Sequence, residues 1–146
     1  MKPSANAYNL AKESEGLRLT AYPDPASGGE PYTIGYGSTR GVKKGMTINL
    51  AEAQQRLVVD MTEAGNAVTR WVDVPLTQGQ FDALADFVFN LGEGRFRSST
   101  LLNRINAKDF TSAAAEFPKW TKAAGKVMPG LVTRRAKERA LFEGRL

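Results

Sequence analysis

The feature that most constrains the fold of this chain is a turn-rich stretch between residues 17 and 48. It contains six glycines and three prolines, which are unfavourable in the interior of a helix. Two short β-prone pieces, residues 19–22 and 32–36, lie among these turns. The stretch therefore predicts a small antiparallel sheet inserted into a chain whose other segments have helical spacing.

Helices are predicted on both sides of this stretch. Apolar residues recur at helical spacing between residues 4 and 14, with Ser4 as the N-cap and Gly16 as the stop. The pattern Asn49-x-x-Glu52 predicts the start of a helix over residues 50–71. A capping box at residues 77–80 precedes a helix central to the larger core, and further helices are predicted over 98–106, 109–120 and 131–142.

These elements predict an α+β fold in one domain of residues 1–146. A β-containing lobe of about residues 15–48 is joined by the 50–71 helix to a mostly helical lobe of about residues 72–146. The seven aromatic residues on helical stripes are expected to pack in the core; they are Trp71, Phe81, Phe87, Phe89, Phe110, Phe117 and Trp120. No internal repeat or linker indicates a separate wall-binding domain.

The composition excludes several kinds of chemistry. The chain has no cysteine and no histidine, so it has no disulfides, no thiolate metal site and neither a Ser-His-Asp nor a Cys-His catalytic set. An ordinary zinc hydrolase site is excluded on the same ground. We therefore expect no metal and no cofactor. Carboxylate catalysis and a pure binding function remain open.

Charge is distributed unevenly along the chain. Residues 95–146 hold twelve Lys and Arg against four Asp and Glu, whereas residues 1–94 hold eight against eleven. A basic region of this kind attracts a polyanion, which could be nucleic acid, anionic lipid or a cell wall bearing carboxylates. A solvated helix surface explains the same pattern equally well.

No apolar run approaches the roughly 18 residues that span a bilayer. The first residues also lack the apolar centre of a secretory signal. We therefore expect a soluble protein without classical export.

Two carboxylates and a hydroxyl lie around the turn-rich stretch: Glu15, Asp24 and Thr33. Hydrolysis of a glycosidic bond needs a carboxylic acid that protonates the leaving oxygen and a second polar group that orients water. Glu15 ends a predicted helix, where the dipole disfavours an ionised carboxylate, as a general acid requires. The simpler interpretations are a surface glutamate, an Asx-turn aspartate between two prolines and a β-forming threonine.

The chain resembles the phage-type lysozymes of glycoside hydrolase family 24 over almost its whole length. The resemblance rests on several motifs in the family's order: Glu15-Gly16-Leu17-Arg18-Leu19, Tyr22, Asp24, Tyr32-Thr33-Ile34-Gly35-Tyr36-Gly37, Gln80-Phe81-Asp82-Ala83-Leu84, Phe89-Asn90-Leu91-Gly92, Ser99-Thr100-Leu101-Leu102, Pro129-Gly130-Leu131-Val132 and Arg134-Arg135.

The resemblance implies a lysozyme-like fold and an endolysin that hydrolyses the β-1,4 bond between N-acetylmuramic acid and N-acetylglucosamine in peptidoglycan. By position, Glu15 is the general acid, Asp24 orients or activates the water, and Thr33 helps to hold it. Members of the family are usually assigned a mechanism that inverts the anomeric configuration, which suits two carboxyl groups about 6.5–9.5 Å apart. The chain departs from the family pattern in a longer spacing between Asp24 and Thr33, and in Ser38 at a position that is often histidine.

Four further residues are weaker substrate-binding candidates: Glu30, Tyr32, Asn90 and Gly92. Arg18 is expected to pair with a buried acid, or else to contact carboxylates of the wall peptides.

Alternative functions stay open beside the muramidase. A lytic transglycosylase cleaves the same bond but closes an anhydro ring, and a catalytically inactive wall-binding protein would also explain the basic C-terminal third. We expect no nucleic-acid partner and a monomer.

The resemblance implies accumulation in the host bacterial cytoplasm until a holin allows release to the periplasm and cell wall. Residues 131–146 are a candidate for a second, membrane-contacting function. As a basic amphipathic helix they would touch anionic membranes through Arg134, Arg135, Lys137 and Arg139.

Overall fold

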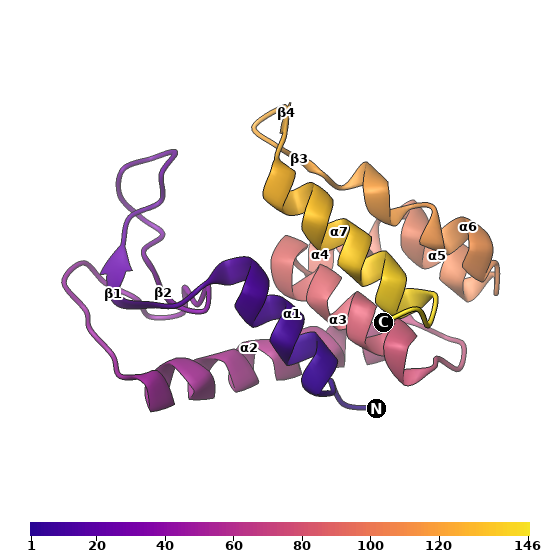
Figure 1. Cartoon of the computed structure of the whole chain (residues 1–146), viewed down its shortest axis with the longest axis horizontal. Helices are drawn as coiled ribbons and strands as arrows, with labels where there is room; N and C mark the ends of the chain where they lie inside the picture. Colours follow the sequence, from indigo (N-terminus) through magenta and orange to yellow (C-terminus); the bar gives the residue numbers. More distant parts are fainter. The chain divides into compact units, whose positions relative to one another are not determined.

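The computed structural model describes all residues, 1–146, and divides them into two compact units. The helical unit comprises Met1–Leu10 and Met61–Leu146, and the turn-rich unit comprises Ala11–Asp60. Helices α1 (Ala5–Glu15) and α2 (Leu50–Trp71) contribute residues to both units (Figure 1). None of the helices combines the length and the apolar character that a membrane-spanning helix needs.

The turn-rich unit contains the predicted sheet. Strand β1 (Arg18–Tyr22) pairs antiparallel with β2 (Thr33–Gly35), with Arg18 opposite Gly35 and Tyr22 opposite Thr33. The buried apolar side chains of this unit come from the end of α1, the sheet, the following turns and α2: Ala11, Ile34, Tyr36, Val42, Ile48, Ala53 and Leu57.

Helix α2 begins and ends where the sequence predicts. The Glu52 N–H donates to Asn49 Oδ1 at 2.8 Å, and the Asn49 N–H donates to Glu52 Oε1 at 3.2 Å. These reciprocal bonds satisfy two groups that the first helical turn leaves without partners. The cap therefore fixes the point at which the turn-rich stretch becomes helix.

The helical unit is built mainly on α3 (Gln78–Leu91) packed against α7 (Pro129–Phe142), which lie side by side in Figure 1. Around this pair lie α4 (Glu93–Arg97), α5 (Thr100–Asn106), α6 (Phe110–Ala114) and the 3₁₀ helix η1 (Phe117–Lys119). The predicted capping box at Thr77 is present. The Phe87 ring contacts three other aromatic rings edge-on, which are Phe96, Phe117 and Trp120.

Three parts of this unit differ from the sequence-based prediction. The short helix α4 lies where no helix is predicted. The helix expected over residues 109–120 stops at Ala114, and a 3₁₀ turn follows around Pro118, whose ring cannot donate an N–H to a continuing helix. Short strands β3 (Lys122–Ala123) and β4 (Lys126–Val127) form a hairpin that was not predicted. Its two-residue turn places Ala124 and Gly125 at φ 51° and 78°.

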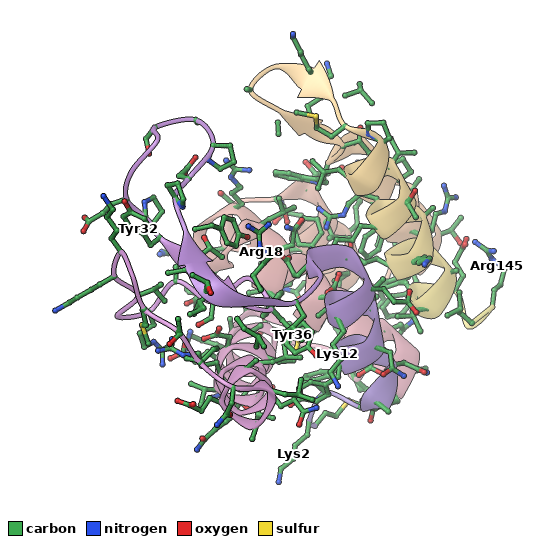
Figure 2. The ribbon with its side chains drawn as sticks, turned by 60° about the vertical axis from the view of Figure 1, so that its left-hand side comes forward. Lys2, Lys12, Arg18, Tyr32, Tyr36 and Arg145 are labelled. Carbon is green, nitrogen blue, oxygen red and sulfur yellow. The ribbon has the colours of Figure 1, made fainter.

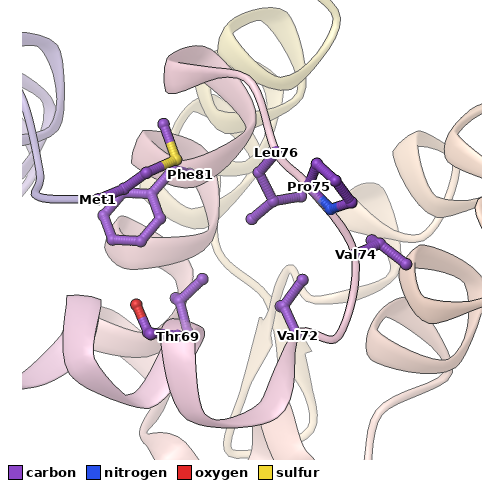
Figure 3. Close-up of a pocket in the computed structure, with 8 residues that line it drawn as sticks. Met1, Thr69, Val72, Val74, Pro75, Leu76 and Phe81 are labelled. Atoms are coloured by element: carbon purple, nitrogen blue, oxygen red, sulfur yellow. The ribbon is translucent and has the colours of Figure 1, made fainter.

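A hollow of about 340 Å³ opens between the C-terminal half of α2, the following loop and the start of α3 (Figure 3). Its lining is mostly apolar: Met1, Val68, Thr69, Val72, Val74, Pro75, Leu76 and Phe81. It contains no candidate site residue.

A cluster of four buried charged residues joins α3 to α7. The Arg134 guanidinium donates two hydrogen bonds to the Asp86 carboxylate, at 2.9 and 2.8 Å. Arg135 Nε lies 2.8 Å from Glu138 Oε1, although the two atoms are not aligned as a hydrogen bond. Arg134 and Arg135 are only 3% and 0% exposed. In the folded chain these two arginines therefore lie inside the core, and do not form the basic outer face that the sequence suggests for residues 131–146.

The pKa values of the two acids in this cluster are shifted in opposite directions, although burial alone raises both. Burial raises the pKa of Asp86, but hydrogen bonds from Arg134 and Glu138 and the charges of both arginines outweigh it and hold the pKa below its ordinary value. Burial, together with the nearby Asp86 charge, raises the pKa of Glu138 well above its ordinary value. Glu138 is thus the acid of the cluster that favours the protonated form.

We predict that Glu138→Gln makes stability less dependent on pH. Since the pKa of Glu138 in the folded state lies above 4.5, its contribution to stability is complete below pH 4.5 and is lost as pH rises through the raised pKa. Denaturant unfolding of both proteins between about pH 5 and pH 8 should show the parent losing stability relative to the variant. A difference that is constant over this range would contradict the assignment.

Candidate active site

Glu15 is the last residue of α1, as the sequence predicts. Gly16 follows at φ +71°, and its N–H donates to the Lys12 carbonyl at 3.0 Å. A left-handed glycine at this point ends the helix and turns the chain toward β1. The half-buried Glu15 side chain thus starts from a fixed helix end.

The Glu15 carboxyl lies against the tight turn of residues 34–38. Ile34 and Ser38 close this turn by exchanging two backbone hydrogen bonds of 2.9 Å. A Cβ added to Gly37 would lie 2.6 Å from Glu15 Oε1, which is closer than real Cβ contacts come. Gly37 also has φ +78°, a conformation that favours glycine. The turn therefore needs glycine here both for its backbone shape and for the approach of the carboxyl.

Thr33 immediately precedes this turn. It is half-buried, begins β2 and lies opposite Tyr22 of β1. Only Gly16 and Leu17 separate Glu15 from β1. Glu15 and Thr33 are therefore parts of one continuous local structure.

Asp24 lies two residues beyond Tyr22, at the end of the sheet where β2 begins with Thr33. Its Oδ1 accepts the Ala26 N–H at 2.7 Å, which is an Asx-turn. Its backbone also closes the loop, through bonds of 2.9 and 2.7 Å with Gly29 and Gly28. The turn-forming interpretation is confirmed, and it fixes the carboxylate with Oδ2 as the oxygen not used in the turn.

The weaker candidates fall in both units. Glu30 is exposed in the loop after Asp24, and Tyr32 is half-buried next to Thr33. Asn90 and Gly92 belong to the helical unit, at the end of α3. Asn90 Oδ1 accepts from Arg135 Nη2 at 2.7 Å. Because Arg135 is itself buried in the charged cluster, the orientation of the Asn90 amide is fixed by that cluster.

Arg18 does not pair with a buried acid, contrary to the prediction. Its side chain is exposed, and its guanidinium lies 4.6 Å from the centre of the Tyr22 ring. In the same unit Lys12 Nζ lies 5.8 Å from the centre of the Tyr36 ring, and Figure 2 labels both residues. The buried arginines of the chain are Arg134 and Arg135 instead.

Sequence reasoning missed two features of the site. One is the contact of Gly37 with Glu15, although the Gly-x-Gly spacing was visible. The other is Arg56 of α2, whose Nη1 donates to Ser38 Oγ at 3.2 Å and to the Arg40 carbonyl at 2.9 Å. Nothing in the sequence pairs Arg56 with Ser38, which lies 18 positions away. No group of acidic residues is arranged to hold a metal ion.

Comparison with known proteins matches the chain to one family. The profile of the family described as phage lysozyme covers residues 12–138. The endolysin of Salmonella phage P22 is 42% identical over 147 residues, which cover 97% of this chain and 98% of that protein. The solved muramidase domain of SpmX from Asticaccaulis excentricus has a TM-score of 0.88 at 37% identity, covering 97% of each chain.

The endolysin of Bacillus phage PZA is 44% identical over 143 residues, and the chain spans 55% of that relative's length. On these findings the chain belongs to the phage lysozyme family. The lysozyme-like α+β fold predicted from the sequence is confirmed.

We predict that Gly37→Ala lowers activity because its methyl group would displace the Glu15 carboxyl. Misplacement of a catalytic group by about 1 Å can cost about 100-fold in rate. Lysis of purified peptidoglycan measures the loss, with circular dichroism to verify folding. Gly41→Ala is the matched control, because Gly41 has a similar φ of +64° but open space around it. Equal activity of the two folded variants would contradict the role of the contact.

Proposed function

We propose that this chain is a muramidase of the endolysin type. It hydrolyses the β-1,4 bond between N-acetylmuramic acid and N-acetylglucosamine in bacterial peptidoglycan. The observation that carries the proposal is the Glu15 carboxyl at the end of α1, set against Gly37 of the 34–38 turn. Membership of the phage lysozyme family supports the same reaction.

In this mechanism Glu15 acts as the general acid. Its proton passes to the glycosidic oxygen while the bond from that oxygen to the anomeric carbon of N-acetylmuramic acid breaks. Water bonds to the same carbon from the opposite face. Asp24 accepts a proton from this water, and the Thr33 hydroxyl holds it in place. Exchange with solvent then returns both carboxyls to their starting states.

The arrangement of the strands supports inversion. Glu15 precedes β1 and Asp24 follows it, so the five residues of β1 lie between the two carboxyls in sequence. A strand advances about 3.3 Å per residue, which keeps the two ends of β1 well apart. Inverting enzymes need room for a water molecule between sugar and base, whereas retaining enzymes bring their carboxyls to about 5–5.5 Å.

We predict that the first product formed is the α-anomer of the new reducing end. Proton NMR on a soluble peptidoglycan fragment, recorded before mutarotation, distinguishes the two anomers. Initial accumulation of the β-anomer would instead indicate retention and would contradict the role given to Asp24.

The biological role that follows is host-cell lysis by a phage or prophage. The protein would act as a monomer on peptidoglycan after a holin allows it to leave the cytoplasm. Transient contact with anionic membranes would depend on half-buried cations of α7 such as Lys137 and Arg139, because Arg134 and Arg135 are buried in the charged cluster.

We predict that Glu15→Gln folds normally but loses about 10²–10⁴-fold in activity, because the amide cannot donate the proton. Mass spectrometry of the products from purified Gram-negative peptidoglycan is the measurement. Reducing N-acetylmuramic ends formed by the parent alone would support the muramidase. Anhydro ends would indicate a lytic transglycosylase, and the absence of glycan fragments would leave a binding protein.

A further inference from the structure

The turn that carries Gly37 is supported by one face of α2. A Cβ added to Gly35 would lie 3.5 Å from Ala53 of this helix, which is ordinary van der Waals contact. Ala53 and Arg56 are three residues apart and so share a face of the helix. The same face therefore meets the start of the turn through Ala53 and its end through Arg56.

Arg56 holds the end of the turn by two hydrogen bonds from one nitrogen. Nη1 donates to Ser38 Oγ at 3.2 Å and to the Arg40 carbonyl at 2.9 Å. Ser38 is only 2% exposed, so its hydroxyl is shielded from water that would otherwise compete for this bond. Arg56 itself is half-buried along the wall of a pocket of about 310 Å³.

A short path connects Arg56 to the Glu15 carboxyl. Ser38 is bonded through its backbone to Ile34 and is the chain neighbour of Gly37. Gly37 in turn has no side chain between its backbone and the carboxyl. A displacement of Ser38 would therefore move the surface on which Glu15 rests.

We propose that Arg56 is a positioning residue for Glu15, acting through Ser38 and the 34–38 turn. Its guanidinium sets where the turn lies on α2, and the turn sets where the carboxyl meets the glycosidic oxygen. The inference rests on the proposed muramidase function, since it assigns Arg56 a part in placing the general acid. Arg56 touches neither substrate nor the reacting atoms in this account.

The test is steady-state kinetics of Arg56→Ala on a soluble peptidoglycan fragment. We expect kcat to fall by about 10- to 100-fold with little change in KM, because the acid is misplaced while the sugar-binding surface is kept. Arg56→Lys should recover only part of kcat, because the lysine side chain is one bond shorter and its ammonium does not reach the position of Nη1. Ser38→Ala should lower kcat in the same direction, and the double variant should lose less than the product of the two single losses.

Arg40→Ala is the matched control. It removes a guanidinium from the same pocket but leaves the backbone carbonyl that Arg56 binds. Thermal unfolding of every variant distinguishes a loss of activity caused by unfolding from one caused by displacement of the Glu15 carboxyl.

The proposal is overturned if folded Arg56→Ala keeps the parent kcat, if its loss appears only in KM, or if Arg40→Ala loses as much kcat. It is also overturned if the loss of kcat in the double variant equals the product of the losses in Ser38→Ala and Arg56→Ala. If Arg56→Ala does not fold, Arg56→Lys takes its place in this comparison. An inactive parent protein would instead contradict the proposed function itself.

Discussion

The contact between the Glu15 carboxyl and the backbone of Gly37 is the constraint on which the proposed chemistry depends. A carboxyl on a free surface could turn in many directions, whereas this one starts from a terminated helix and rests on a closed turn. The two backbone bonds between Ile34 and Ser38 keep that turn closed. Orientation of this kind lowers the barrier because the entropy of alignment is lost on folding and not during the reaction.

The helical unit has to accommodate charged side chains in its core. It places two arginines and two acids in its core, where isolated charges are costly. Arg134 of α7 pairs with Asp86 of α3, and Arg135 lies beside Glu138 within α7. The same cluster holds the amide of Asn90 at the end of α3. Charge that the sequence assigns to an outer basic face is thus partly internal, which reduces the cationic surface available to membranes or other polyanions.

Local features of the fold were predictable from sequence and distant ones were not. The ends of α1 and α2, the capping boxes at Asn49 and Thr77 and the Asx-turn at Asp24 each depend on residues within a few positions. The family resemblance supplied the roles proposed for Glu15, Asp24 and Thr33. Bonds such as Arg56 to Ser38 and Arg134 to Asp86 join residues 18 and 48 positions apart, and no periodic pattern encodes them.

The most direct measurement of the central claim is a crystal structure of the Glu15→Gln variant with a peptidoglycan fragment bound across the scissile bond. The account predicts the residue 15 side chain within about 2.6–3.2 Å of the glycosidic oxygen. It also predicts a water held by Asp24 and Thr33 on the opposite face of the sugar. A fragment bound away from residue 15, or a water that neither Asp24 nor Thr33 contacts, would contradict it.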